Sequence, residues 1–336
     1  MAKHAIVMIP GDGIGPEVTS AARDVLEAAG LSVEWVEVPA GAVALEQGFE
    51  NVLPQRTLEA VSAHKVALKG PVTTPVGGGF TSVNVQLRKK LNLYAAVRPV
   101  RSLRGVKTRY ENVDLIIIRE NTEGLYSGIE NEITPGVVTC LKVATEVACT
   151  RIARFAFRYA TNRHRRRITV FHKANIMKLT DGMFLNCARR VHEQEYPDIE
   201  YEELIIDAAC MKVVQDPTRT DMILCENLYG DVVSDLCAAL VGGLGVVPGA
   251  NIGDEAAVFE AVHGSAPDIA GKGVANPLAC IMSGVMMLRH LNEDAIAEKI
   301  KHAYDAVLTE GKTLTRDLGG TAGTKDFTAA VIENLR

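Results

Sequence analysis

The stretch that decides this fold is Ile223-Leu224-Cys225-Glu226-Asn227-Leu228-Tyr229-Gly230-Asp231-Val232-Val233-Ser234-Asp235. Its apolar start predicts a buried strand, which breaks at Tyr229-Gly230 and continues as a helix with Asp231 in the first turn. Asp231 and Asp235 lie four positions apart, so on a helix both carboxylates leave the same face. Such a pair at the end of a strand indicates a divalent-cation site. A helix N-cap followed by a solvent-exposed aspartate has the same pattern, and this segment alone leaves both interpretations open.

The composition of the chain is that of a soluble globular protein. Hydrophobic residues make up 47% and charged residues 23% of the sequence. The length of 336 residues predicts about two domains. The net charge of −5 gives no reason to expect a nucleic-acid partner. The one basic run, Arg163-His164-Arg165-Arg166-Arg167, follows a helical pattern and is explained by a solvent-exposed helix end.

The cysteines indicate a reducing compartment. All seven are dispersed without a Cys-x-x-Cys pair, so we expect no disulfide framework. The first strand begins at Ala5, with no signal or transit pattern before it. The longest apolar run, from Pro277 to Leu288, is too short to span a bilayer. We therefore expect a cytoplasmic protein without membrane contact.

Strand and helix patterns alternate along most of the chain. This alternation predicts an α/β sheet with helices on both faces. The predicted strands cover 5–9, 32–38, 65–69, 93–100, 115–118, 168–171, 203–206 and 257–260, and the predicted helices include 16–29, 147–161, 179–194, 277–290 and 293–309.

Two segments depart from a simple alternation. The turn Gly11-Asp12-Gly13-Ile14-Gly15 is followed at once by Pro16, which does not fit the Gly-x-Gly-x-x-Gly loop of a Rossmann fold. A tight strand-to-helix turn explains it better, because proline suits the first turn of a helix. Between 122 and 146 several glycines and Pro135 interrupt the pattern, so we expect an arm or hairpin insertion there.

Charged residues gather at the predicted strand ends. Arg98, Arg119, Lys173, Asp207 and Asp231 each end or follow an apolar strand, and ligands of open α/β sheets bind at such ends. The forked guanidinium group of arginine suits carboxylates, so several arginines imply a polycarboxylate ligand. Several aspartates imply a hard cation.

On these residues the chain resembles the β-decarboxylating dehydrogenases, the family of isocitrate, isopropylmalate and homoisocitrate dehydrogenases. The resemblance extends over nearly the whole chain, from Ile9–Gly15 to Asp317–Gly320. Its most specific part is Asn227-Leu228-Tyr229-Gly230-Asp231-x-x-Ser234-Asp235 together with Gly242-Gly243-Leu244-Gly245. Within the family, Ser82-x-Asn84-x-x-x-Arg88 and the segment 119–128 resemble the members that act on isocitrate with NAD.

The resemblance implies a family fold that is not a Rossmann fold. It has two α/β domains, a central mixed sheet and an arm. A large, cofactor-binding domain would cover 1–96 and 243–336. A small domain with the substrate site, the metal site and the dimer interface would cover 97–242, including a clasp at 124–145. The family pattern further implies a homodimer or higher homo-oligomer whose active sites are shared between subunits, with Lys173 and Asp207 acting in the partner's site.

The implied reaction is the oxidative decarboxylation of D-isocitrate to 2-oxoglutarate and CO2, with reduction of NAD and help from Mg2+ or Mn2+. By the family pattern, Tyr126, Lys173 and Asp207 are catalytic, Asp207, Asp231 and Asp235 bind the metal, and Ser82, Asn84, Arg88, Arg98 and Arg119 bind the substrate. The expected cofactor-binding residues are Thr74, His263, Gly264, Ala266, Asp268, Ile269 and Asn276. Lys173 is expected to have a lowered pKa, because the metal and the arginines lie near it.

Two alternatives remain at this stage. Homoisocitrate or 3-isopropylmalate is a second possible substrate, since one methylene group gives only about 1–3 kcal/mol of discrimination. Ser82 and Asn84 argue against isopropylmalate, whose family members need an apolar pocket there. A non-catalytic regulatory subunit is the other alternative. It is disfavoured because none of the expected chemical groups is missing.

Overall fold

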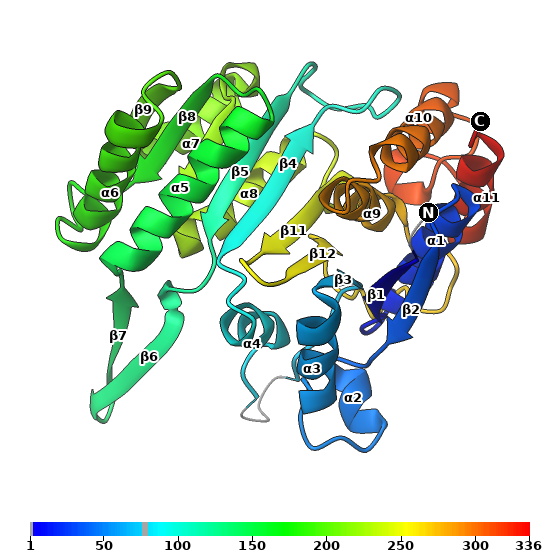
Figure 1. Cartoon of the computed structure of the whole chain (residues 1–336), viewed down its shortest axis with the longest axis horizontal. Coiled ribbons are helices and arrows are strands. Elements are labelled where there is room, and N and C mark those ends of the chain that lie inside the picture. Colours follow the sequence, from blue (N-terminus) through cyan, green and yellow to red (C-terminus); the bar gives the residue numbers. More distant parts are fainter. Residues whose placement is uncertain (1–2, 76–79) are drawn as a thin grey trace. The chain divides into compact units, whose positions relative to one another are not determined.

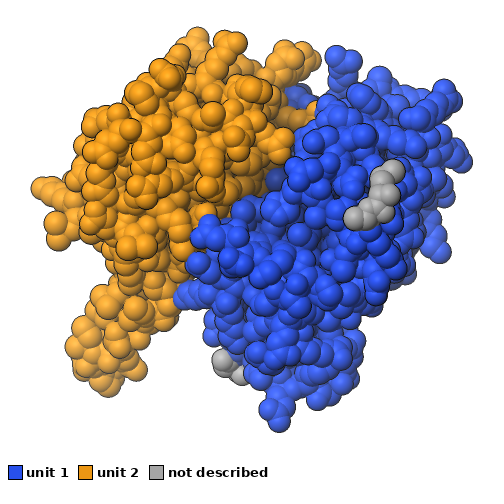
Figure 2. Space-filling model, in the orientation of Figure 1, with its two compact units in different colours: residues 1–93, 102–109, 241–336 blue, residues 94–101, 110–240 orange. Residues whose placement is uncertain are grey.

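The computed structural model describes residues 3–75 and 80–336. The chain divides into two compact units (Figure 2). Unit 1 comprises Met1–Leu93, Ser102–Arg109 and Val241–Arg336, and unit 2 comprises Tyr94–Arg101 and Tyr110–Leu240. Unit 1 is therefore built from both ends of the chain and unit 2 from its middle. The predicted division into a cofactor domain and a substrate domain stays a prediction.

The strands of unit 1 have the order β2-β1-β3-β12-β11 (Figure 1). They are β1 (His4–Ile9), β2 (Val33–Glu37), β3 (Val66–Lys69), β11 (Pro248–Ile252) and β12 (Ala257–Ala261). β1 pairs in parallel with both β2 and β3, and β3 pairs in parallel with β12. β11 is antiparallel to β12, which makes the sheet mixed.

Helices cover both faces of the sheet in unit 1. They are α1 (Gly15–Ala28), α2 (Ala42–Glu46), α3 (Gln55–His64), α4 (Val83–Lys90), α9 (Leu278–His290), α10 (Asp294–Glu310) and α11 (Thr324–Glu333). Val7 and Ile9 of β1 belong to one core cluster with Leu58 of α3. Successive strand residues point to opposite faces, so Ile6 faces the other side of the sheet, where α1 and α9 pack together.

The strands of unit 2 have the order β4-β5-β10-β8-β9. They are β4 (Ala95–Arg101), β5 (Asp114–Glu120), β8 (Arg167–His172), β9 (Glu200–Ile205) and β10 (Met222–Cys225). β4 is antiparallel to β5, whereas β5, β10, β8 and β9 run parallel. The central strand β10 is entirely buried, as expected for a strand covered on both faces.

Two pairs of helices cover the parallel strands of unit 2. The pairs are α5 (Glu146–Asn162) with α6 (Thr180–Glu195), and α7 (Ile206–Gln215) with α8 (Asn227–Leu240). Within each pair the helices contact each other and the strands. The hairpin of β6 (Gly124–Thr134) and β7 (Val137–Val143) forms a separate two-stranded sheet whose residues are mostly exposed (Figure 1). This hairpin is the arm that the sequence predicted.

The predicted fold class is confirmed. The elements α2, α3, α11 and β11 were not predicted, and two further corrections concern the predicted metal ligands. The helix of the opening stretch begins at Asn227, directly after β10, so Tyr229-Gly230 lies inside the helix and Asp231 lies in its second turn. The helix α7, which places Asp207 in its first turn, was not predicted. Among the described residues, no helix is long and apolar enough to span a membrane.

Candidate active site

Arg119 forms the centre of a polar cluster at the carboxyl end of β5. Its side chain is only 1% exposed. Nε and Nη2 donate hydrogen bonds to Oδ1 of Asn227 at 3.1 and 2.7 Å, and Nη1 pairs with the carboxylate of Asp231. Tyr126 of β6 donates its hydroxyl hydrogen to the other oxygen of Asp231, and its ring centre lies 5.1 Å from the guanidinium carbon. Three predicted site residues are therefore in direct contact.

The start of α8 explains why these groups meet. The carboxylate of Glu226 accepts hydrogen bonds from the backbone N–H groups of Leu228 and Tyr229, and so caps the helix directly after the strand. Gly230 then passes over Arg119 so closely that a Cβ atom at this position would lie 2.5 Å from Cγ of Arg119. This glycine leaves room for the buried arginine instead of breaking the helix.

Asp235 lies one helical turn after Asp231 and is exposed. Partial burial and the nearby carboxylate of Asp231 raise the pKa of Asp235, while Arg98 and Arg119 act in the opposite direction. Arg98, on β4, is buried. Both aspartates are therefore part of one charged cluster, together with two of the predicted substrate-binding arginines.

The hydroxyl group of Tyr126 remains protonated at neutral pH. Partial burial raises its pKa, and the hydrogen bond to the Asp231 carboxylate raises it further. Arg119 opposes this effect only in part. Tyr126 thus keeps its proton and donates it in a hydrogen bond to Asp231, while its catalytic role stays a prediction.

Lys173 and Asp207 form a second cluster in unit 2. Nζ of Lys173 pairs with the carboxylate of Asp207, and this pair lowers the pKa of Asp207. The backbone N–H of Lys173 donates to the buried Asp181 at 2.7 Å, and Asp181 also pairs with Lys142 of the arm at 2.5 Å. The arm, the loop after β8 and the start of α6 are therefore connected next to Lys173.

The structure does not bring all three predicted metal ligands together within one chain. The described residues contain no group of three or more His, Cys, Asp or Glu side chains that could hold a metal ion. Asp231 and Asp235 share one helix face, while Asp207 pairs with Lys173. Two carboxylates on a helix face are suitable oxygen donors for Mg2+ or Mn2+, but they form an incomplete ligand set.

The remaining predicted substrate residues lie on α4 of unit 1. Ser82 precedes the helix and is exposed, and Oδ1 of Asn84 is buried without a hydrogen-bond partner among the described residues. Nη2 of Arg88 lies 3.8 Å from Oε1 of Glu260, whose other oxygen pairs with the buried Lys69 at 2.7 Å. The orphaned amide oxygen can accept a hydrogen bond from a ligand hydroxyl group, and the buried arginine suits an anionic group of the same ligand.

The segment after β12 contains most of the predicted cofactor residues. Burial lowers the pKa of His263, and its Nε2 atom is buried without a hydrogen-bond partner among the described residues. Around Gly264, a Cβ atom would meet nothing within 4 Å. Ala266 has a φ of 39°, in the left-handed region, which is unfavourable for alanine and is typical of ligand-binding turns.

Three other predicted cofactor residues show how this segment is held. The exposed Asp268 has its backbone oxygen bonded to Lys272, while Ile269 is partly buried next to it. Asn276 donates to Asp317 at 2.8 Å and accepts from the first turn of α9. Elsewhere in unit 1, the hydroxyl oxygen of Thr74 accepts from the backbone of Val83 at 3.1 Å. The buried, unpartnered His263 nitrogen and the exposed Asp268 carboxylate fit an adenosine moiety.

Two residues near the site were missed by the sequence analysis. Asn227 orients Arg119, and Lys69 neutralises Glu260 beside Arg88. Lys69 ends the otherwise apolar strand β3 and is itself 1% exposed. A lysine that continues an apolar strand pattern was the available signal, because a buried lysine needs a charged partner.

The chain belongs to the isocitrate/isopropylmalate dehydrogenase family. The model of this family matches residues 5–331, so the predicted family is confirmed over nearly the whole chain.

Two curated relatives and one crystal structure show which members of the family this chain is similar to. The chain is 52% identical to isocitrate dehydrogenase [NAD] catalytic subunit 5, mitochondrial, of Arabidopsis thaliana, covering 98% of this chain and 87% of the relative. It is 48% identical to a mitochondrial regulatory subunit of the NAD isocitrate dehydrogenase of Dictyostelium discoideum, covering 98% of this chain and 91% of the relative. A crystal structure of isocitrate dehydrogenase from Methylococcus capsulatus matches with a TM-score of 0.95 and 48% identity, covering 99% of both chains.

These relatives correct one prediction. Both curated relatives are named as mitochondrial proteins, so the expectation of a cytoplasmic protein is wrong. Both are also named as subunits, one catalytic and one regulatory. The predicted homo-oligomer is therefore only one of the possible assemblies.

Proposed function

We propose that the chain catalyses the oxidative decarboxylation of D-isocitrate to 2-oxoglutarate and CO2 with NAD as the oxidant. The observation that carries this proposal is the contact of Arg119, Tyr126 and Asp231, with Asp235 one turn away. A carboxylate-binding guanidinium, a fixed proton donor and a pair of metal-binding carboxylates are the groups that this reaction requires. The NAD-dependent relatives support the same activity.

The arginines bind the carboxylates of the substrate. Arg119 is buried at the end of β5, and Arg88 is buried on α4. Arg98 is buried in the middle of β4, so the expectation that it ends a strand is wrong. Ser82 and Asn84 bind the carboxylate that distinguishes isocitrate from isopropylmalate. The formal charges balance: the three substrate carboxylates and three aspartates are neutralised by a divalent cation, three arginines and protonated Lys173. This balance avoids a buried unpaired charge, which costs several kcal/mol.

Asp231 and Asp235 would hold Mg2+ or Mn2+, with Asp207 of a neighbouring chain as the third carboxylate. When bound, such a cation stabilises the negative charge that develops on the substrate oxygen. The raised pKa of Asp235 fits this role, because its causes are partial burial and then the neighbouring carboxylate of Asp231. A cation between the two carboxylates would remove that repulsion.

Two protons are moved by side chains of the protein. Lys173 first passes its own proton through Asp207 to water and then takes the hydroxyl proton of the substrate. The hydrogen on the hydroxyl-bearing carbon leaves as a hydride to NAD. Cleavage of the bond to the β-carboxylate then releases CO2 and leaves its electron pair on the substrate. Tyr126 donates its hydroxyl proton to the carbon that carried the β-carboxylate, and its raised pKa keeps the proton available until this step.

The segment 263–276 holds the adenosine part of NAD. His263, with its buried and unpartnered Nε2, contacts the base. The exposed carboxylate of Asp268 accepts hydrogen bonds from the ribose hydroxyl groups. A 2′-phosphate at this position would meet a like charge, which disfavours NADP. Gly264, Ala266, Ile269, Asn276 and Thr74 complete the cofactor site.

The active assembly is a homodimer or higher homo-oligomer in which chains exchange Lys173 and Asp207. Large apolar side chains are exposed around these two residues: Ile176, Leu179 and Met183 near Lys173, and Met211 and Val214 on α7. Leu179 is 86% exposed. Contiguous exposed apolar residues next to the separated halves of a site indicate a subunit interface. A heteromeric assembly, as the names of the relatives suggest, uses the same surface.

A regulatory subunit is the second candidate function, because one relative bears that name. A chain that only regulates has no need of an intact catalytic cluster. Here Arg119, Tyr126 and Asp231 remain in contact, and Lys173 remains paired with Asp207. These contacts favour a catalytic chain.

The test is NADH formation by the purified protein without any other type of chain. With NAD and Mn2+, we expect turnover of D-isocitrate to exceed that of homoisocitrate and of 3-isopropylmalate by at least tenfold in kcat/KM, and we expect a chelator to abolish it. The variant Asp235→Asn should be inactive, while Asp305→Asn on α10 of unit 1 should keep full activity. Turnover of another acid in preference, or no turnover until a different chain is added, would refute the proposal.

A further inference from the structure

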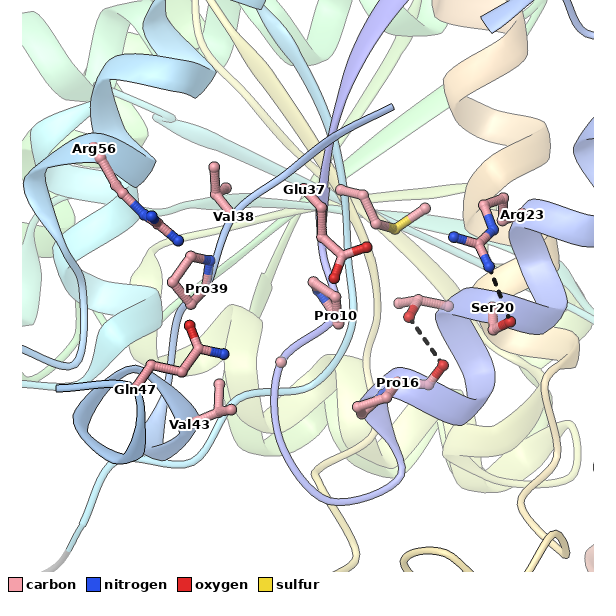
Figure 3. Close-up of a pocket in the computed structure, with 13 residues that line it drawn as sticks. Pro10, Pro16, Ser20, Arg23, Glu37, Val38, Pro39, Val43, Gln47 and Arg56 are labelled. Carbon is pink, nitrogen blue, oxygen red and sulfur yellow. Dashed lines mark hydrogen bonds between the residues drawn. The ribbon is translucent and has the colours of Figure 1, made fainter. Parts of the chain in front are cut away.

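A crevice at the β1–β2 edge of unit 1 is separate from every residue assigned above. Its volume is about 350 Å³, within the range of small-molecule sites. One side consists of the turn after β1 and the start of α1, and the other consists of the end of β2 with α2 and α3 (Figure 3). Its polar lining includes Ser20, Arg23, Glu37, Gln47 and Arg56.

The topology explains why the crevice exists. β2 and β3 lie on opposite sides of β1, so the β1-α1-β2 and β2-α3-β3 connections run in opposite directions along the sheet. Both crossovers are expected to be right-handed, which places α1 and α3 on opposite faces. After β1 the chain therefore continues on one face of the sheet, and after β2 it continues on the other face. Ligands of open α/β sheets bind at such a switch point, beside the carboxyl ends of the strands.

The polar groups of the crevice are open to a ligand. The Glu37 carboxylate, the Gln47 amide and the Arg56 guanidinium form no hydrogen bond or ion pair with any residue that the structure describes. Arg56 is nonetheless held in place, because its guanidinium carbon lies 4.5 Å from the centre of the Phe49 ring. Arg23 already has partners: Nη2 lies 3.5 Å from the hydroxyl oxygen of Ser20, and Nε lies 3.9 Å from the exposed carboxylate of Asp24. In Figure 3, Glu37 lies between the two arginines.

The turn after β1 cannot itself hold the phosphate of a ligand. In dinucleotide folds this turn provides the backbone N–H groups that bind phosphate. Here the N–H groups of Asp12, Ile14 and Gly15 already donate to the backbone oxygens of Pro71, Ser265 and Asp12, at 2.8, 2.9 and 2.8 Å. An anionic group in the crevice must therefore bind to Arg56 and Arg23.

Glu37 is suited to bind the sugar hydroxyl groups of a ligand whose anionic group binds to Arg56 and Arg23. An acidic residue at the end of the second strand accepts hydrogen bonds from ribose hydroxyl groups in dinucleotide folds. Glu37 is the last residue of β2 and faces the crevice. The floor beside it is apolar, with Met8, Val38 and Pro39. We propose that this crevice binds a ribose phosphate group, with the sugar hydroxyls on Glu37 and the phosphate on Arg56 and Arg23.

The crevice is distinct from the proposed cofactor site. The segment 263–276 meets the other side of the same turn, where Ile14 donates to the backbone of Ser265 at 2.9 Å and Thr73 bonds to the Ser265 side chain at 2.7 Å. None of the residues that line the crevice belongs to that segment. The two sites can therefore be occupied together.

The test is a calorimetric titration of the whole chain with ribose 5-phosphate, with saturating NADH present to fill the cofactor site. We expect one saturable site per chain. Arg56→Ala should weaken ribose 5-phosphate binding at least tenfold, as should Glu37→Gln. Glu37→Gln should leave the weaker binding of inorganic phosphate unchanged, because phosphate does not use the sugar contact. The exposed Arg104→Ala and Glu333→Gln serve as matched controls and should change nothing.

Two sources of the ribose phosphate group are distinguished by a second series. Tighter binding of uridine or guanosine monophosphate than of ribose 5-phosphate identifies a nucleotide, and equal or weaker binding identifies a free sugar phosphate; both agree with the proposal. Three results would overturn it: no saturable binding up to millimolar concentrations, loss of binding when NADH is present, or equal affinity in wild type, Arg56→Ala and Glu37→Gln. All variants lie at the surface, and their melting temperatures confirm that they are folded.

Discussion

The orientation and protonation of the candidate site residues depend on the side chains that they contact. Arg119 is fully buried, yet it faces Asp231, whose side chain is 43% exposed. One end of this ion pair is thus anchored in the core, and the other is open to a ligand. Tyr126 completes the arrangement, because its hydroxyl hydrogen bond to Asp231 both orients the ring and keeps the proton in place.

The role of Tyr126 gives a prediction at this scale. Tyr126→Phe removes the proton donor but keeps the ring against Arg119, so kcat should fall about 100-fold, the usual contribution of a positioned acid. The KM for isocitrate should change little. Tyr201→Phe is the matched control, because Tyr201 also donates its hydroxyl hydrogen to a carboxylate, that of Glu203, at 2.7 Å. Equal kcat values for the two variants in a steady-state assay would exclude Tyr126 as the donor.

At the scale of elements, α8 is the part that assembles the site. Glu226 caps its first turn, Gly230 lets it approach Arg119, and Asp231 and Asp235 occupy one of its faces. Glycine inside a helix costs about 1 kcal/mol relative to alanine. Glycine is nevertheless required at position 230, because any side chain there would displace the buried arginine.

This crowding predicts that alanine substitutions at two helical glycines change the free energy of unfolding in opposite directions. Gly230→Ala should lower the free energy of unfolding by about 1–3 kcal/mol, because overpacking against Arg119 outweighs the gain in helix propensity. It should also weaken isocitrate binding. Gly182→Ala in α6 is the control: a Cβ atom there meets nothing within 4 Å, so stability should rise by about 0.5–1 kcal/mol. Denaturant titration of both variants checks the signs, and a stabilised Gly230→Ala would contradict this account.

Most elements of the fold could be predicted from the sequence, because their apolar periodicity is strong. Strands such as β5 and β10 are runs of buried residues, and the long helices alternate with them. The error at the start of α8 has a physical cause. The sequence shows Tyr229-Gly230 as a break, and only the structure shows that the glycine accommodates Arg119.

The candidate site was predictable only where its residues follow strands or belong to a family motif. Arg119 and Asp231 satisfied both conditions. The supporting contacts of Asn227 and Lys69 depend on pairing between segments far apart in the sequence. The lysine at the end of an apolar strand indicates that a charged partner exists, but not which residue it is. We propose that Asp207 of one chain joins Asp231 and Asp235 of a neighbouring chain. Such an arrangement depends on how the chains assemble, and no local sequence pattern indicates it.

At the scale of the whole molecule, the proposed active site is divided between two chains. Within one chain, Lys173 and Asp207 pair with each other, and Asp231 and Asp235 remain without a third carboxylate among the residues that the structure describes. In the proposed assembly, the exposed apolar residues beside Lys173 and on α7 would contact a second chain. An isolated monomer should therefore bind NAD but should not turn over isocitrate.

Shared sites predict complementation between two inactive variants. Lys173→Met and Asp231→Asn are each expected to be inactive as homo-oligomers. After the two are mixed, denatured and refolded together, about half of the dimers should contain both variants, each with one intact site. The mixture should then regain about a quarter of the wild-type activity, since the interface is reciprocal. A mixture no more active than its components would show that each chain uses its own Lys173.

The most direct test of the central claim is a crystal structure with D-isocitrate and Mn2+, in which anomalous scattering locates the metal. We predict a manganese ion between the carboxylates of Asp231 and Asp235, with Asp207 of a second chain as a further ligand and Arg119 on a substrate carboxylate. A manganese ion bound elsewhere, or Asp231 and Asp235 pointing apart with no ion between them, would contradict the account.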